Sequence, residues 1–234
     1  IMRNLGAPVI EAYGLTEGGP QVLMSPLTNN PRFGSVGKVI PGCEVKLLAA
    51  TTMPGDSIGE LEEVPLGSDG EIWVKSPGVT VGYYNRPDET ASKISPDGWL
   101  RTGDIANKDA EGWFRISGRY DDMMVVGGEN VYPNEVEALI TSIPGVKQAA
   151  VVPVPEEVKG QVPVAFVIAD GLTEEQVKEH SLSQGAAYAH PRRVWFEPSL
   201  PISGTGKIDR RQLIDRAKEL YADSEKGQRG ENLN

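Results

Sequence analysis

The chain has 234 residues, which is enough for one large domain or two small domains that each bury a hydrophobic core. Its 33 acidic and 23 basic side chains leave a formal net charge of −10 at pH 7, which argues against a sequence-independent grip on nucleic acid or an anionic membrane. The single cysteine, Cys43, excludes an internal disulfide framework and suits a reducing cytoplasmic compartment, and no run of about 18 apolar residues is present to span a membrane.

The first residues of the sequence resemble the interior of a folded domain more than the natural start of a protein. The stretch IMRNLGAPVIEAYG has no initiator methionine at position 1 and no polar lead-in or signal peptide. We therefore expect a piece of a longer chain.

Residues 1–120 follow a β-rich pattern. Short runs of β-branched and aromatic residues alternate with glycine and proline turns. This pattern predicts strands at 9–13, 44–49, 71–74 and 112–118, with one short helix near 87–94.

The pattern changes after Arg119, where helices and strands alternate. Residues 133–143 carry apolar side chains at helical spacing, with Pro133 at the start and a Pro-Gly pair after the end. Strands are expected at 147–154, 162–169 and 192–197, and a second helix over 173–189. A last helix should start at Asp209, where Gln212 three residues later gives a capping-box pattern.

These patterns predict a mixed α/β and α+β chain with two domains. Residues 1–120 would form a β-rich unit and residues 121–222 a compact α+β unit, which has a normal domain size. The polar residues 223–234 are expected to be disordered. The short charged junction GRYDDMMVVGGEN is a candidate hinge.

The segment PISGTGKIDR, residues 201–210, places Lys207 behind two glycines and before a helix. A phosphate-binding P-loop needs G-x-x-x-x-G-K-[ST], but Pro201 occupies the first glycine position and Ile208 follows the lysine. Taken alone, the segment is best explained as a flexible glycine turn with a solvated lysine.

Five separated stretches share an order and spacing that is informative as a set. They are YGLTEGG (13–19), GWLRTGD (98–104), GRYDDMM (118–124), GGENVYPNEVE (127–137) and PISGTGK (201–207). Together they resemble the C-terminal motifs of the adenylate-forming enzymes, which include acyl- and aryl-CoA synthetases, firefly luciferase and peptide-synthetase adenylation domains. The resemblance extends to about residue 222. It implies the β-rich end of a large AMP-binding domain followed by a small mobile lid domain.

The resemblance implies an ATP-dependent acid-CoA ligase that makes an acyl-adenylate and then transfers the acyl group to CoA. Tyr13 and Gly14 would contact the nucleotide, and Thr16 would donate to the α-phosphate. Glu17 would be the Mg²⁺ ligand, because this hard ion prefers carboxylate and phosphate oxygens. By itself the heptad is also explained by a turn with a solvated glutamate.

Two further residues of the first unit are implied to hold the nucleotide. Asp104, which we expect on a tight turn set by Gly103, would accept hydrogen bonds from the ribose hydroxyls, as carboxylates do in dinucleotide folds. Arg119 would be a second ribose or phosphate contact. Each motif alone is also explained by a turn or a surface ion pair.

The remaining implied roles fall on the second unit. Asp121 would be the pivot of the lid, and Gly127, Gly128 and Glu129 would lie against the pantetheine arm of CoA, although a plain strand-to-helix turn explains the glycine pair equally well. Lys207 would stabilise the charge that builds up at the α-phosphate during adenylation and withdraw for thioester formation. Lys159, Arg192 and Arg193 are candidates for contacts with the CoA phosphates.

The implied cofactors are ATP, Mg²⁺ and CoA, and the implied partners are a carboxylate substrate and the N-terminal portion of the same enzyme. That portion would carry the phosphate loop, so the chain alone is expected to be inactive. A homodimer of the full enzyme is compatible with the resemblance. Two alternatives stay open: an adenylation domain that passes the acyl group to a carrier protein, and a non-catalytic fragment that binds nucleotide or a partner protein.

Overall fold

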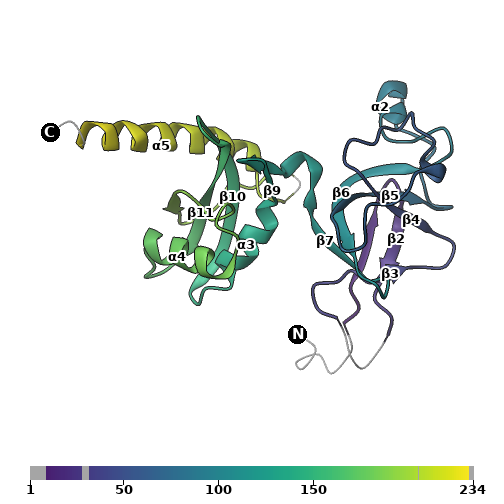
Figure 1. Ribbon diagram of the computed structural model, residues 1–234, viewed down its shortest axis with the longest axis horizontal. Helices are drawn as coiled ribbons and strands as arrows, with labels where there is room; N and C mark the ends of the chain where they lie inside the picture. Colours follow the sequence, from purple (N-terminus) through teal and green to yellow (C-terminus); the bar gives the residue numbers. More distant parts are fainter. Residues whose placement is uncertain (1–8, 28–31, 205, 232–234) are drawn as a thin grey trace. The chain divides into compact units, whose positions relative to one another are not determined.

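The computed structural model describes residues 9–27, 32–204 and 206–231, and of residues 225–231 it describes the backbone alone. The chain divides into two compact units, Ile1–Asp121 and Asp122–Asn234 (Figure 1). The boundary falls beside Tyr120, where the sequence pattern changes. Within the described ranges, no helix is long and apolar enough to cross a membrane.

In residues 9–27 and 32–121, the first unit forms two antiparallel sheets. The three-stranded sheet has the order β1 (Ala12–Leu15), β2 (Gly19–Met24), β3 (Lys38–Val39). The four-stranded sheet has the order β4 (Glu44–Leu48), β5 (Gly70–Lys75), β6 (Leu100–Lys108), β7 (Phe114–Arg119). The helices η1 (Ile58–Glu60) and α2 (Pro87–Ala91) lie in connections between strands.

The four-stranded sheet is covered on both faces, because successive side chains of a strand point in opposite directions. Ile72 and Val74 of β5 join a buried cluster with Leu23 and Phe114. Trp73, which lies between them, is fully buried in a second cluster on the other side, together with Leu48, Ile58 and Trp99. Central strand β5 is therefore held from both sides, which fixes the neighbouring strand β6.

The described residues of the second unit form a mixed sheet with three α-helices. The sheet has the order β10 (Val146–Glu156), β11 (Gly160–Ala169), β8 (Met124–Val126), β9 (Glu129–Val131), and β12 (Val194–Phe196) pairs in parallel with β11. Helices α3 (Pro133–Thr141) and α5 (Arg210–Glu231) pack on β10, and α4 (Glu174–Gln184) contacts α3. The short helix η2 (Tyr120–Asp122) lies at the unit boundary.

Most of the expected elements are present. The predicted strands at 44–49, 71–74, 147–154 and 162–169 are confirmed, as is the helix that starts at Pro133. Asp209 caps α5 as expected, because its carboxylate accepts from the backbone N–H of Gln212 at 3.1 Å. Thr173 and Gln176 form a complete capping box at the start of α4.

Three expectations about element limits were wrong. The first strand starts at Ala12, three residues later than expected, and α4 ends at Gln184, because a continued helix would have to pass Gly185. The disorder expected over 223–234 does not match α5, which continues as a helix through Glu231. Its polar residues include good helix formers, and an established helix extends at little cost. Residues 232–234 lie outside the described part of the chain.

Candidate active site

A cavity of about 170 Å³ in the first unit brings together three of the predicted site residues, Glu17, Asp104 and Arg119. These residues come from three separate motifs. The cavity is smaller than a typical ligand pocket of about 300–1,000 Å³, so it has room for only part of a nucleotide. Its remaining lining residues are Leu15, Tyr83, Lys93, Leu100, Arg101 and Thr102.

Asp104 is the centre of a hydrogen-bonded group. Tyr13 donates its hydroxyl to Asp104 Oδ2 at 2.6 Å, and Arg119 Nη1 donates to Oδ1 at 2.9 Å. Burial, followed by the negative charge and hydrogen bond of Asp104, raises the pKa of Tyr13 far above its ordinary value of 10.0. Tyr13 therefore stays protonated and acts as a hydrogen-bond donor, while Asp104 is presented as a carboxylate with both oxygens oriented.

Asp104 lies in a bulge of strand β6, and the expectation of a tight turn was wrong. Glu71 of β5 pairs with Ile105 and Trp73 pairs with Arg101, so that one residue of β5 stands opposite residues 102–104 of β6. Gly103 has a φ of +77°, a conformation that favours glycine. A bulge of this kind re-aims the following side chain, and here that side chain is Asp104.

A buried ion pair holds the bulge in place. Glu71 has no exposed surface, and its two carboxylate oxygens accept from Arg101 Nε at 2.9 and 3.0 Å. Glu71 Oε1 also accepts from the backbone N–H of Gly103 at 3.1 Å. The hydroxyl of Thr102 donates to the carbonyl of Ile72 at 2.8 Å and accepts from the N–H of Asp104 at 3.0 Å. Glu71 and Arg101 are thus site residues that the motifs did not identify, although a glutamate inside the apolar strand EIWV was a visible signal.

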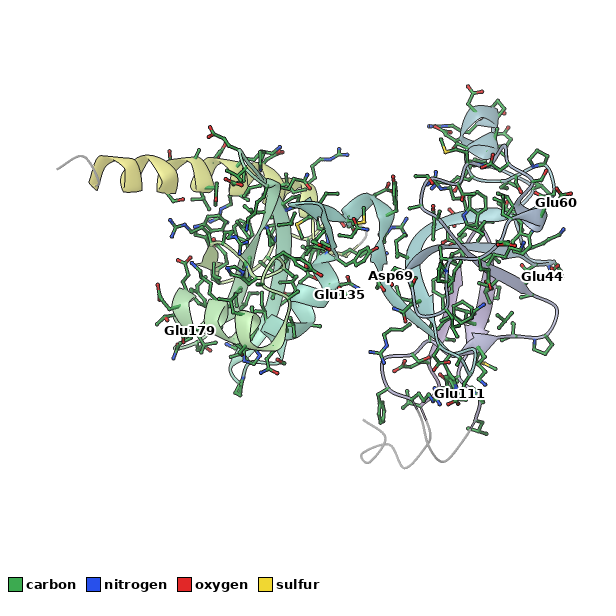
Figure 2. All side chains as sticks on the ribbon, viewed as in Figure 1. Glu44, Glu60, Asp69, Glu111, Glu135 and Glu179 are labelled. Atoms are coloured by element: carbon green, nitrogen blue, oxygen red, sulfur yellow. The ribbon has the colours of Figure 1, made fainter. Side chains whose placement is uncertain are left out.

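A second bulge precedes Arg119. Ile105 pairs with Gly118 and Ala106 with Ile116, which leaves Ser117 of β7 as the extra residue. Asp69, labelled in Figure 2, accepts from the hydroxyl of Ser117 at 2.7 Å. This hydrogen bond holds the bulge residue of β7 in place just before Arg119.

Glu17 lies on the turn between β1 and β2 that the sequence predicts. Its Oε1 accepts from the hydroxyl of Tyr83 at 2.9 Å, and its backbone carbonyl accepts from the N–H of Thr80 at 2.7 Å. Thr16 beside it is exposed. Gly14 is required for packing, because a Cβ there would lie 2.2 Å from the carbonyl oxygen of Pro20.

A divalent cation would need phosphate oxygens in addition to Glu17. Among the described residues, no three His, Cys, Asp or Glu side chains are grouped to hold a metal ion. Glu17 keeps one carboxylate oxygen that no described residue occupies. Mg²⁺ characteristically combines one or two carboxylates with substrate phosphates, so this donor set fits the ion when a nucleotide is bound.

Lys93 is a further cavity residue that the motifs missed, and no sequence signal pointed to it. It is half-buried, and its ammonium group has no hydrogen bond or ion pair within the described residues. Its Nζ lies 3.9 Å from the position that a Cβ on Gly103 would take. An uncompensated cation therefore borders the cavity beside Arg119.

The glycine pair of the second unit forms a β-hairpin turn, which corrects the expected strand-to-helix turn. Gly127 and Gly128 connect β8 to β9 with φ values of +62° and +94°, as in a two-residue hairpin loop with positive φ at both positions. Helix α3 begins only at Pro133. A Cβ on Gly128 would meet nothing within 4 Å in the described structure, so this residue is not required for internal packing. Glu129 is exposed next to it.

Lys207 lies in a closed turn that leads into α5. Ile202 and Ile208 form an antiparallel bridge, and the N–H of Ser203 donates to the carbonyl of Lys207 at 2.7 Å. The N–H of Gly206 donates to the carbonyl of Ser203 at 2.9 Å. The Lys207 side chain is exposed, and its ammonium has no partner in the part of the chain described here. The expected surface turn is confirmed, but these hydrogen bonds restrain its backbone more than a flexible tether would. Thr205 lies outside the described residues.

Comparisons with known proteins agree with the five motifs. The family model "AMP-binding enzyme" matches residues 1–84, and "AMP-binding enzyme C-terminal domain" matches residues 135–207. The long-chain-fatty-acid–CoA ligase of Escherichia coli O6:H1 is 41% identical over 219 residues, which are 93% of this chain and 37% of that protein. The 2-succinylbenzoate–CoA ligase of Bacillus cereus is 37% identical over 217 residues, which are 92% of this chain and 43% of that protein.

Solved structures show the same relationship. ATP-bound MatB from Rhodopseudomonas palustris superposes with a TM-score of 0.81 at 33% identity, over 92% of this chain and 42% of that chain. The O-succinylbenzoate CoA synthetase of Bacillus subtilis in complex with AMP gives a TM-score of 0.79 at 31% identity, over 91% and 42%. The fold is that of the adenylate-forming enzymes. The chain belongs to the AMP-binding enzyme family and spans less than half the length of these relatives.

Proposed function

We propose that this chain is the C-terminal part of an ATP-dependent acid-CoA ligase, which joins a carboxylate to AMP and transfers the acyl group to CoA. The observation that carries the proposal is the cavity in which Glu17, Asp104 and Arg119 meet. Relatives named as CoA ligases for long-chain fatty acids and for 2-succinylbenzoate support the reaction class.

Asp104 would bind the ribose. Each of its oxygens already accepts one hydrogen bond, from Tyr13 or Arg119, and a carboxylate oxygen has capacity for a second. Vicinal ribose hydroxyls could thus donate to the carboxylate without displacing either partner. Tyr13 would then border the adenine, and Gly14 would allow the chain to approach it closely.

Thr16 and Glu17 would act on the phosphates. The exposed hydroxyl of Thr16 is available to donate to the α-phosphate, and Glu17 would supply one oxygen to Mg²⁺ while Tyr83 holds its other oxygen. The bound ion would neutralise phosphate charge. Lys93 would add a cation at the same cavity, directed to a phosphate or ribose oxygen.

The second unit would serve both half-reactions. Lys207 would stabilise the negative charge that develops as the carboxylate attacks the α-phosphate, which requires an unpaired ammonium such as the one described above. Gly127, Gly128 and Glu129 would border the pantetheine arm of CoA in the transfer step. Asp121, at the unit boundary, would be the pivot between the two arrangements.

A chimera tests the proposal. The chain would replace the matching segment of the E. coli relative, and ATP–pyrophosphate exchange and acyl-CoA formation would be measured with a long-chain fatty acid. We expect both activities, and we expect their loss in the Asp104→Ala variant. A folded chimera with neither activity would contradict the proposal.

Two controls separate the rival functions. Exchange activity without acyl transfer to CoA, but with transfer to a phosphopantetheine carrier protein, would indicate an adenylation domain. Micromolar ATP binding by the 234-residue chain alone would indicate an autonomous nucleotide-binding module.

A further inference from the structure

A two-armed ion pair connects the helix that follows the Lys207 turn to the rest of the second unit. Arg210 Nη1 donates to Glu137 Oε1 at 2.7 Å, and Arg210 Nη2 donates to Oε2 at 3.0 Å. Both side chains are mostly buried, with exposed fractions of 27% for Arg210 and 15% for Glu137. Such forked pairs fix direction as well as distance.

The backbone of strand β10 completes this arrangement. Glu137 Oε1 accepts from the N–H of Val151 at 2.7 Å, and Arg210 Nη1 donates to the carbonyl of Val151 at 2.9 Å. Helix α3, strand β10 and helix α5 therefore meet at one point. Burial alone lowers the pKa of Arg210, but the hydrogen bonds and charge of Glu137, together with the charge of Asp122, raise it above the ordinary arginine value.

The pair lies directly behind the Lys207 turn. Arg210 is the first residue of α5, and Asp209 before it donates its N–H to the carbonyl of Pro201 at 2.8 Å. The two ends of the turn, at Pro201 and Asp209, are therefore joined to each other directly beside Arg210. The ion pair of Arg210 with Glu137 attaches this base of the turn to helix α3. The hydrogen bonds of Ser203 and Gly206 join the turn to this base, so the direction of the turn should depend on where the base is held.

The other functional loop of the unit has separate supports. The Gly127–Gly128 hairpin is held by the β8–β9 ladder and by the hydrogen bond from the N–H of Gly127 to the carbonyl of Lys159 at 3.0 Å. None of these contacts involves Glu137 or Arg210. Loss of the ion pair should therefore disturb the Lys207 turn and leave the hairpin in place.

We propose that Glu137 and Arg210 are positioning residues that aim Lys207 in the adenylation step. The inference rests on the proposed function for the role of Lys207. The geometric part, in which the ion pair restrains the turn, is independent of catalysis.

Hydrogen–deuterium exchange of the 234-residue chain tests the geometric part. In Arg210→Gln and Glu137→Gln, the amides of Ser203, Gly206 and Asp209 should exchange roughly tenfold or more faster, because hydrogen bonds between charged groups are lost. Exchange of residues 124–131 should stay unchanged. Arg216→Gln is the matched control: it removes another α5 arginine, which pairs with Glu197 of a different segment at 2.6 Å.

The half-reactions of the chimera test the catalytic part. Arg210→Gln should slow ATP–pyrophosphate exchange by about 10²-fold, the effect of a misplacement near 1 Å, and should leave thioester formation from supplied acyl-adenylate nearly unchanged. Arg210→Lys, which keeps the charge and loses the fork, should recover part of the rate. If Arg210→Gln does not fold, Glu137→Gln replaces it, since its amide oxygen can still accept from Val151.

The outcomes separate the two proposals. Unchanged exchange of residues 203–209 in a folded variant, or an equal loss in both half-reactions, would overturn the positioning role. An inactive wild-type chimera would overturn the proposed function instead, and the exchange result would still decide whether the ion pair restrains the turn.

Discussion

Replacing Arg101 by leucine measures the stability of the bulge that presents Asp104. The substitution leaves Glu71, which has no exposed surface, without the partner that binds both of its oxygens. Removing one member of a buried ion pair costs about 3–5 kcal/mol. We expect a loss of this size in the free energy of unfolding of the first unit.

The double variant Glu71→Leu with Arg101→Leu refines the argument. It removes the unpaired charge and leaves the N–H of Gly103 without its acceptor, which costs about 1–3 kcal/mol, while the carbonyl of Ala50 loses only a long contact of 3.4 Å with Arg101 Nη2. The double variant should therefore be more stable than Arg101→Leu alone.

Urea unfolding followed by tryptophan fluorescence provides the assay. In a Trp195→Phe background, the remaining tryptophans at 73, 99 and 113 all lie in the first unit. The control is Arg86→Leu, which breaks an ion pair with Glu89 whose side chains are 66% and 51% exposed. This control should change stability by less than about 1 kcal/mol. A loss in Arg101→Leu no larger than the control would refute the reasoning.

Three further predictions address the site residues. Lys207→Ala in the chimera should slow adenylation about 10²-fold or more, with thioester formation from supplied acyl-adenylate retained; equal losses would exclude a role specific to the first step. Gly103→Ala should destabilise the first unit by about 1–3 kcal/mol, because φ is +77° and the new Cβ would lie 3.1 Å from Arg119 Nη2, and an unchanged urea midpoint would contradict this. Above pH 10, folded Tyr13 retains a proton that the unfolded chain has lost, so stability should fall with pH by up to about 1.4 kcal/mol per unit; the fall should be smaller in Tyr13→Phe, and identical pH profiles would count against a buried, protonated Tyr13.

The sequence alone was sufficient for features that depend on local chemistry. Helix α3 follows from the spacing of apolar residues after Pro133, and the start of α5 follows from Asp209 and Gln212. The five motifs identified the family because a motif is matched residue by residue to a known pattern, which requires no knowledge of the fold. They also identified Glu17, Asp104 and Arg119, which the fold brings to one cavity.

Features that depend on the register between strands could not be predicted from the sequence in the same way. The bulge at Asp104 exists because β5 and β6 pair with an offset, and this pairing joins residues 30 positions apart. Lys93 reaches the cavity only through the path of the chain between α2 and β6. The hairpin at Gly127 was mistaken for a strand-to-helix turn because β9 is only three residues long.

The independent supports of the two loops in the second unit have a consequence for engineering. The hydrogen bonds described above for the Gly127–Gly128 hairpin and for the Lys207 turn are separate, so each loop should tolerate exchange for a relative's loop with little change to the other. On the proposed function, hairpins grafted from relatives with other thiol acceptors should change the recipient of the acyl group while Lys207 keeps its setting.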